Sequence, residues 1–534
     1  MHYANDLDVE YILHSSILYR DDNNNAIAAA YTAAMGEAMT DKTKAQWQTM
    51  ADKLKIEARA FINGHYVDAH DGATRTCYNP ATGTKLADVA NCGIDDADRA
   101  VQGARDAFES GIWSKRSPDA RRAVMVRWAQ LLEDNADELA LLETLDVGKP
   151  IRDTTGSDVP GAIRTIRWSG EAIDKIYEQV APTSHDTIGL VTRIPLGVVA
   201  AIVPWNFPLS TTAWKLGPAL ASGNSVILKP ASNTPLTAIR IAGLAKEAGL
   251  PDGVLQVLPG PGSSMGAHLA THMDIDGLTF TGSTPIGKKL LEYSGQSNLK
   301  RVFNELGGKS PNIVFADADL EKAAEAAAMA CFYNGGQTCT AGTRLIVEES
   351  IHDRFVDMVI EAAKAWQPGD IMDPATAMGP MIDQGQYDTV KDYIAIGDSE
   401  GCTRYGGDSN IFPESGGLFL EPVIFTGVDN SMRIAQEEVF GPVLAVIPFK
   451  TKEEAINIAN DSIYGLGGAI WSRDISNALS VAEEIRVGTL GVNNYFGGDI
   501  TVPFGGFKQS GNGRDKSIHA FDDYTELKTT WIEL

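Results

Sequence analysis

The sequence has no long apolar run and few cysteines among its 534 residues. No stretch approaches the roughly eighteen apolar residues that a membrane span requires, and residues 1–6 lack the basic and then apolar layout of a secretory signal. We therefore predict a cytoplasmic protein. The five cysteines form no CxxC pair, which argues against both a disulfide framework and a zinc ribbon. They are Cys77, Cys92, Cys331, Cys339 and Cys402.

Positive charge is also scarce. The chain has 45 lysines and arginines against 70 aspartates and glutamates, which gives a formal net charge of −25. Such a balance keeps a protein soluble and repels nucleic acid and anionic membranes. We expect neither as a partner.

His268 and His272 have the spacing of metal ligands on one face of a helix. The residue after the first histidine is Leu269, whereas a metalloprotease helix carries a glutamate there. We expect an ordinary helix face and no metal site.

Apolar strand patterns alternate with helical patterns along most of the chain, which predicts an α/β fold. Such alternation implies right-handed crossovers and a parallel sheet. A helical pattern covers residues 95–144, and a second alternating block runs from 312 to about 509. The first alternating block spans residues 196–306. Within it we expect strands near 197–203, 224–229, 253–258, 277–281 and 301–305, with helices at 234–248 and 285–293.

The first fifty residues differ from the rest. They show no periodicity long enough to demand a core. We expect residues 1–50 to be a poorly ordered extension, at least over the first forty or so residues.

Cys339 follows a Gly-Gly-Gln turn that we expect to be flexible, and Glu305 precedes it by 34 positions (339 − 305). The pair supplies a nucleophile and a separate base for covalent catalysis. A lone cysteine is more often a small buried hydrophobe, so the interpretation depends on what accompanies it. Cys331, eight residues upstream (339 − 331), is expected to pack on the same helix.

Asn206 lies between two prolines at the end of the apolar run 196–203. That run has the character of a buried parallel strand, and sites in α/β proteins lie at the carboxyl edge of the sheet. Asn206 is therefore a candidate donor to the oxyanion that forms when a thiolate attacks a carbonyl.

Together these motifs resemble the aldehyde dehydrogenase superfamily, over nearly the whole chain from about Phe61 to Leu534. The resemblance implies a Rossmann-type cofactor domain, an α/β catalytic domain and a β oligomerisation arm, with homodimers or homotetramers as the assembly. The motifs are residues 204–208, 229–232, 280–287, 304–311, 332–339, 437–442 and 503–511. The implied domains are 51–176 with 195–307 for cofactor binding, 308–521 for catalysis, and 177–194 with 522–534 for the arm.

The resemblance also assigns roles. Cys339 attacks the aldehyde, Asn206 and the Cys339 backbone N–H stabilise the oxyanion, Glu305 activates the hydrolytic water, and Lys215 completes the catalytic set. NAD or NADP is the implied cofactor. Its implied binding residues are Ile202, Pro204, Trp205, Lys229, Ser232, Gly282, Ser283, Gly287, Leu306, Glu438 and Phe440.

Ser232 is a departure that concerns the cofactor. Many NAD-preferring relatives carry a glutamate three residues after the lysine, where it repels a 2′-phosphate. Serine removes the repulsion, and Lys229 offers a positive partner. We therefore expect NADP to be used.

The substrate is implied by residues 159–168, 510–517 and 526–532, which look most like the bacterial γ-glutamyl-γ-aminobutyraldehyde dehydrogenases of putrescine breakdown. Phe496 stands where that subfamily carries asparagine. A broad-specificity or succinate-semialdehyde-type enzyme is the alternative, followed by a CoA-acylating enzyme or a non-catalytic homologue. The tunnel residues implied by position are Thr211, Trp214, Tyr333, Phe496 and Phe504.

Overall fold

The computed structural model describes residues 42–534. Most of the predicted amino-terminal extension lies outside this range, but Lys44–Ala51 form helix α3. A capping box between Thr43 and Gln46 starts this helix, and its Trp47 is fully buried. The expectation that residues 1–50 lack a core contact is therefore wrong for α3, because one indole buries enough apolar surface to dock a short helix.

The first sheet has seven strands in the order β11-β10-β7-β8-β9-β1-β2, and its first five strands are parallel. The five predicted strands are confirmed. The strands are β11 (Arg301–Glu305), β10 (Gly277–Thr281), β7 (Val198–Ile202), β8 (Ser225–Lys229), β9 (Leu255–Val257), β1 (Ala60–Ile62) and β2 (His65–Val67).

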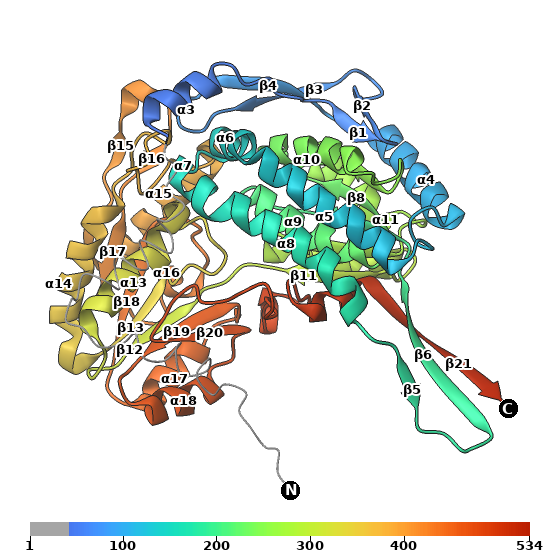
Figure 1. Cartoon of the computed structure of the whole chain (residues 1–534). Coiled ribbons are helices and arrows are strands. Elements are labelled where there is room, and N and C mark those ends of the chain that lie inside the picture. Colours follow the sequence, from blue (N-terminus) through green and yellow to red (C-terminus); the bar gives the residue numbers. More distant parts are fainter. Residues whose placement is uncertain (1–41) are drawn as a thin grey trace, which may run out of the picture.

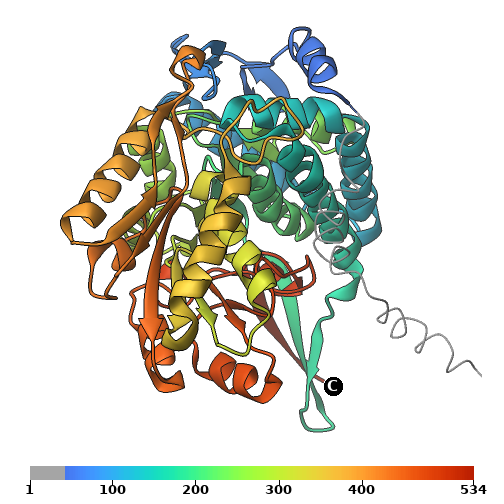
Figure 2. The same cartoon turned by 90° about the vertical axis from the view of Figure 1, so that its left-hand side faces the viewer.

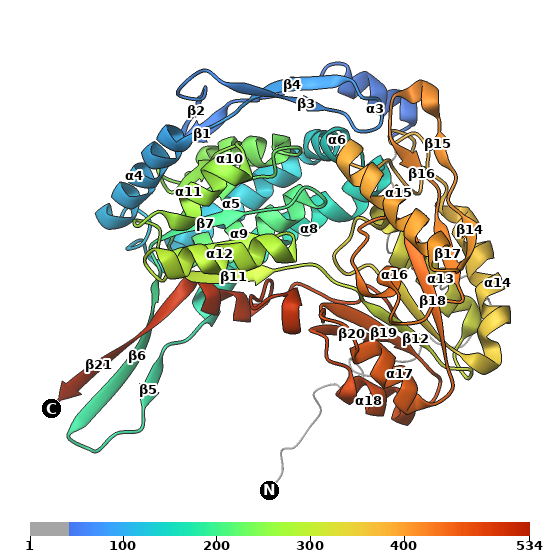
Figure 3. The ribbon, with the colours of Figure 1, turned by 180° about the vertical axis from the view of Figure 1, so that it is seen from behind.

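Helices cover both faces of this sheet, as its apolar strands require. Along β7, Val199 and Ala201 pack with one set of helices, while Val198 and Ala200 pack with the other. The first set comprises α5 (Pro118–Asp134), α6 (Ala136–Val147), α8 (Val159–Ala172), α9 (Pro208–Ala221) and α10 (Leu236–Glu247). The second set comprises α4 (Ile94–Ser110), α11 (Ala267–Thr271) and α12 (Thr284–Gln296), and all three are labelled in Figure 3.

The second sheet lies beside the first (Figure 1) and also has seven strands, in the order β14-β17-β18-β13-β12-β19-β20. All its pairs are parallel except β14–β17. The strands are β14 (Thr403–Gly406), β17 (Val423–Thr426), β18 (Val443–Phe449), β13 (Arg344–Glu348), β12 (Pro311–Val314), β19 (Gly467–Trp471) and β20 (Thr489–Val492). Its helices are α13 (Leu320–Phe332), α14 (His352–Ala363), α15 (Gln384–Ser399), α16 (Arg433–Gln436), α17 (Lys452–Asn460) and α18 (Ile475–Glu484).

A third, three-stranded sheet extends away from the body of the molecule (Figures 1 and 2). It pairs β6 (Thr187–Pro195) with β21 (Thr525–Glu533) and β5 (Gln179–Ala181), so the two segments predicted as an arm do form one sheet. The remaining pairs are β3 (Thr74–Tyr78) with β4 (Lys85–Ala90), and β15 (Ser409–Ile411) with β16 (Phe419–Leu420). No helix among residues 42–534 is long and apolar enough to cross a bilayer.

Candidate active site

The carboxyl edge of the first sheet gathers residues from several motifs. Asn206 follows β7, Ser283 follows β10, and Glu305 is the last residue of β11. The chain order of the strands reverses between β7 and β10, and such a switch point opens the crevice in which α/β proteins bind ligands. The alternation predicted from the sequence therefore places these residues together.

Residues 306–310 cross directly from β11 to β12 and so join the two sheets. At Gly308 a Cβ atom would lie 2.5 Å from the backbone oxygen of Cys339. The glycine thus permits the crossover that carries Glu305 to pack against the loop that carries the nucleophile.

A cavity of about 650 Å³ lies between these segments. Fifteen of the predicted site residues line it: Pro204, Trp205, Asn206, Thr211, Trp214, Gly282, Ser283, Glu305, Leu306, Tyr333, Cys339, Glu438, Phe440, Phe496 and Phe504. Five others, Ile202, Lys215, Lys229, Ser232 and Gly287, are not in its wall. Lys215 donates to Asp515, which is in the wall, whereas Lys229 is the last residue of β8 and Ser232 follows that strand.

The loop before Cys339 is buried and packs against a neighbouring loop. Helix α13 ends at Phe332, so Cys331 does not share a helix with Cys339. Three successive residues, 334–336, have positive φ, and a Cβ at Gly336 would lie 2.1 Å from the backbone oxygen of Gly441. Left-handed backbone in contact with a neighbouring loop leaves no room for a helix to continue.

Gln337 holds this loop in place, a role that the sequence did not reveal. Its buried amide donates to the backbone oxygens of Asn334 and Pro380 and accepts from the N–H of Ile382. The sequence around Gln337 gives no signal for the two long-range contacts, because Pro380 and Ile382 belong to another segment.

Asn206 is tied to the same loop. Its Nδ2 donates to the backbone oxygen of Gln337 at 2.9 Å, and its side chain is 4% exposed. A primary amide has two N–H groups. One therefore orients the side chain, and the second is available to an oxyanion formed at Cys339.

Glu305 and Cys339 share an environment that opposes charge. Burial raises the pKa of the Cys339 thiol to about 12, and the carboxylates of Glu438 and Glu305 contribute to this rise. Burial, followed by the charge of Asp515, raises the pKa of Glu305 well above its ordinary value. Neither carboxylate oxygen of Glu305 has a hydrogen-bond partner among the described residues. Glu305 is thus a buried carboxyl group in the cavity wall, with both oxygens left without a partner in residues 42–534.

Lys215 lies behind Glu305 and pairs with Asp515, its Nζ 2.7 Å from Oδ2 and 3.0 Å from Oδ1. Both side chains are buried. Lys215 favours the charged form of Glu305, and Asp515 opposes it. Asp515 lies in the motif 510–517, and the sequence assigns it no role, because a single aspartate 300 residues from its partner gives no local signal.

Aromatic rings form part of the cavity wall. Phe207 stacks on Tyr333 at 6.2 Å, Tyr333 contacts Phe496 at 6.0 Å, and Trp214 lies 5.1 Å from Phe504. Phe496 is 37% exposed, so it lies at the rim.

Comparison with known proteins decides the family. The aldehyde dehydrogenase family model matches residues 66–530. The chain belongs to the aldehyde dehydrogenase family. It is 54% identical to the NADP/NAD-dependent aldehyde dehydrogenase PuuC of Escherichia coli, over 92% of this chain and 98% of that protein.

Two solved aldehyde dehydrogenases have the same fold. An indole-3-acetaldehyde dehydrogenase from P. syringae, in complex with NAD+ and IAA, is 60% identical with a TM-score of 0.91. The γ-glutamyl-γ-aminobutyraldehyde dehydrogenase of Burkholderia cenocepacia is 53% identical, also with a TM-score of 0.91. Each match covers 92% of this chain and 100% of the solved chain. The predicted α/β fold and the aldehyde dehydrogenase activity are thereby confirmed.

The residues present fit the nicotinamide dinucleotide of an aldehyde dehydrogenase. Ser283 precedes α12, and its side chain makes no cap hydrogen bond, so the first N–H groups of this helix are open to a phosphate. Glu438 is oriented by the N–H of Gly308 at 3.1 Å, which suits a carboxylate that accepts from a ribose. Burial lowers the pKa of Lys229 to about 8, and its Nζ donates to the backbone oxygen of Pro230 at 2.9 Å.

The arrangement can support aldehyde oxidation, because Cys339, Asn206 and Glu305 line one cavity. Cys339 would attack the aldehyde carbon, and Asn206 would donate to the oxygen that becomes negative. When bound, the oxidised cofactor would supply the hydride acceptor and a positive ring that lowers the pKa of the thiol. Glu305 would then take a proton from the water that hydrolyses the thioester on Cys339.

Replacing Asp515 with asparagine should move the acid limb of acyl-enzyme hydrolysis to lower pH. Asp515 raises the pKa of Glu305, so its neutral replacement lets Glu305 lose its proton at lower pH. Hydrolysis rates of the preformed acyl-enzyme measured against pH give the result. Asp522→Asn, at an exposed ion pair with Arg193, is the control. An unmoved limb in Asp515→Asn would show that Asp515 does not act on Glu305.

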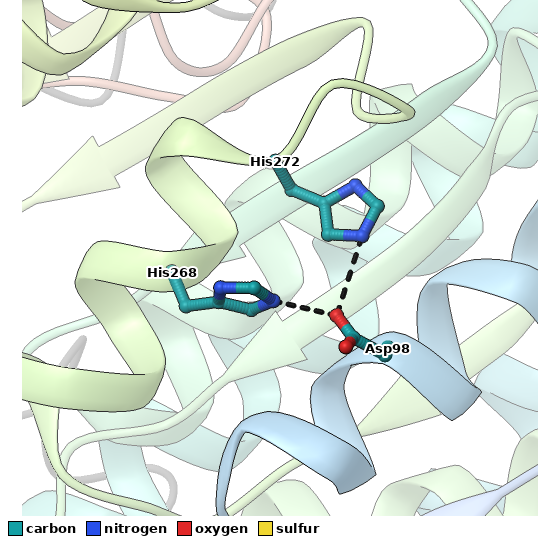
Figure 4. A group of neighbouring side chains, drawn as sticks. All are labelled: Asp98, His268 and His272. Atoms are coloured by element: carbon teal, nitrogen blue, oxygen red, sulfur yellow. Dashed lines mark hydrogen bonds and ion pairs between the residues drawn. The ribbon is translucent and has the colours of Figure 1, made fainter.

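His268 and His272 meet an acid that the sequence did not indicate. Both Nε2 atoms approach Oδ1 of Asp98 from α4, at 2.5 and 3.4 Å (Figure 4). Nδ1 of His272 accepts the backbone N–H of Asp274, which places the proton of a neutral ring on Nε2. That nitrogen then faces Asp98, while Nε2 of His268 makes a hydrogen bond to the same carboxylate. The cluster therefore favours a hydrogen-bonded clamp between α4 and α11.

Proposed function

We propose that this aldehyde dehydrogenase oxidises an ω-amino or γ-glutamylamino aldehyde of polyamine breakdown to the carboxylic acid. The γ-glutamyl-γ-aminobutyraldehyde dehydrogenase of B. cenocepacia, which this chain matches over the whole length of that protein, supports this substrate. The observation in this chain that supports it is the aromatic wall, because rings accommodate an extended or cationic chain. Glu305 in the cavity wall favours hydrolysis of the thioester over its transfer to CoA.

An aromatic aldehyde is the second candidate substrate. The P. syringae indole-3-acetaldehyde dehydrogenase is 60% identical to this chain, and the same aromatic wall would stack against an indole. The broad-specificity and succinate-semialdehyde alternatives stay open beside it.

A substrate panel separates these candidates. We expect kcat/KM for γ-glutamyl-γ-aminobutyraldehyde to exceed that for propanal and benzaldehyde by about tenfold, or ~1.4 kcal/mol of transition-state preference. An extended chain uses remote contacts that a short aldehyde lacks. Phe496→Asn, at the rim, should change the ranking of aldehydes and leave the cofactor constants unchanged. A tenfold preference for indole-3-acetaldehyde or a simple aliphatic aldehyde would exclude the proposed substrate.

The cofactor proposal is that NADP is accepted alongside NAD. It rests on Ser232, whose Oγ donates to the backbone oxygen of Gly260 at 3.1 Å and offers no negative charge to a 2′-phosphate. Ser232→Glu should raise KM for NADP at least about tenfold more than KM for NAD, since a carboxylate would face the phosphate. Steady-state kinetics with both cofactors test this. Absence of any NADP reduction by the unaltered enzyme would refute the proposal.

We also propose assembly into homodimers or homotetramers through the three-stranded arm. Large apolar side chains are exposed along it, and an unpaired strand edge of this kind invites a partner. They are Tyr177, Val180, Leu527, Trp531 and Leu534. The cytoplasmic location and the domain boundaries given above stay predictions.

A further inference from the structure

Lys516 is a cation beside the tunnel for which the reaction described above has no use. Its Nζ lies 4.6 Å from the centre of the Trp214 ring and 5.6 Å from that of Phe504. Both rings line the cavity that contains Cys339. The ammonium therefore lies over two rings of the aromatic wall, although Lys516 is not itself among the residues that line the cavity.

The charges around this wall leave Lys516 without a counter-ion. Asp158, which lines the cavity, is 2.8 Å from the buried Nζ of Lys149, and Asp515 is paired with Lys215. In the described part of the chain, no carboxylate lies within ion-pair distance of Lys516. Asp499 and Arg164 influence its charge from farther away, with opposite signs. Asp158 and Asp515 are thus each paired with another lysine, and neither forms an ion pair with Lys516.

Burial has a cost for such an ammonium. It lowers the pKa of Lys516, although Asp515, Asp499 and Cys339 act in the opposite direction. Lys516 is half-buried. A cation that has lost part of its water and lies over ring faces binds an anion well, because the anion restores a charge-assisted hydrogen bond.

The backbone holds Lys516 in a conformation that its residue type does not favour. Its φ is 61°, in the left-handed region. Two hydrogen bonds of 2.7 Å between Asp515 and Phe504, and a third from Ser517 to Ile500, surround it and fix the turn. Backbone geometry alone would favour glycine here, and a strained residue at a cavity points to a role for its side chain.

We propose that Lys516 binds a carboxylate at the far end of the aldehyde chain, so that the tunnel selects aldehydes that carry a distal acidic group. The inference deepens the proposed function, since a γ-glutamylamino aldehyde ends in an amino acid, and it rests on aldehyde oxidation at Cys339. Lys516 would act on specificity rather than on the chemical steps.

The test compares acids with their methyl esters at equal chain length. Values of kcat/KM are measured for 4-oxobutanoate, 5-oxopentanoate and 6-oxohexanoate and for the three esters. In the unaltered enzyme, at least one acid should exceed its ester by roughly tenfold to a hundredfold, the range expected for a hydrogen bond to a charged group. An acid-to-ester ratio near one at all three lengths overturns the proposal.

Variants separate charge from packing. Lys516→Met should bring the acid-to-ester ratio close to one while ester turnover stays within about twofold, and Lys516→Arg should keep the ratio. Lys391→Met is the matched control, because Lys391 also lies over a ring, 5.4 Å from the centre of Tyr387, but that ring does not line the cavity. Equal losses for acid and ester in Lys516→Met would show a packing role and refute carboxylate binding.

The outcome is independent of the amine end of the substrate. If the panel shows no preference for γ-glutamylamino or ω-amino aldehydes while the acid-to-ester ratio holds, the proposed substrate fails and the role of Lys516 stands. A preference for amino aldehydes with a ratio near one would support the proposed substrate and refute carboxylate binding by Lys516.

Discussion

Cys339→Ala should abolish aldehyde-dependent reduction of the nicotinamide cofactor, a loss of roughly 10⁴-fold or more. Without a sulfur at this position no covalent adduct forms, and so no hydride can leave from it. The absorbance of reduced cofactor measures the loss.

Cys331→Ala is the matched control for this prediction. Cys331 is fully buried in the core around α13, and burial raises the pKa of its thiol. Its removal should lower stability without stopping turnover. Substantial activity in Cys339→Ala, or its loss in Cys331→Ala alone, would place the nucleophile elsewhere.

Glu305→Gln should keep a single burst of reduced cofactor while steady turnover falls by about 10²–10⁴-fold, the usual contribution of a general base. The carboxylate of Glu305 is one of two that raise the pKa of Cys339. Its neutral replacement therefore does not hinder thiolate formation, and only hydrolysis of the thioester is lost. Stopped-flow absorbance gives the burst amplitude for each active site.

Glu437→Gln controls for the loss of a carboxylate near the cofactor cleft, since Glu437 pairs with Arg433 and does not line the cavity. It should leave both phases unchanged. A lost burst in Glu305→Gln would assign Glu305 to acylation, and undiminished steady turnover would remove it from the reaction.

Local patterns in the sequence determined the sheets and the main catalytic residues. Alternating strands and helices imply a parallel sheet, and the carboxyl ends of its strands share one edge. Asn206, Ser283 and Glu305 each end or follow a strand of the first block, so strand positions alone bring them together. Cys339 could be predicted as the nucleophile because its motif and the other motifs of the chain follow one another in the order found in one family.

Tertiary structure alone decided which charges meet. Lys215 and Asp515 are 300 positions apart, Asp98 meets His268 from another helix, and Lys516 lies over a ring of α9. The fixed turn held by Gln337 and the docking of Trp47 belong to the same class. Hydrophobic periodicity reports which face of an element is buried, but not which side chain of a distant element lies opposite it. The pKa of Glu305 and the uncompensated charge of Lys516 arise from such encounters, so they became visible only once the chain was folded.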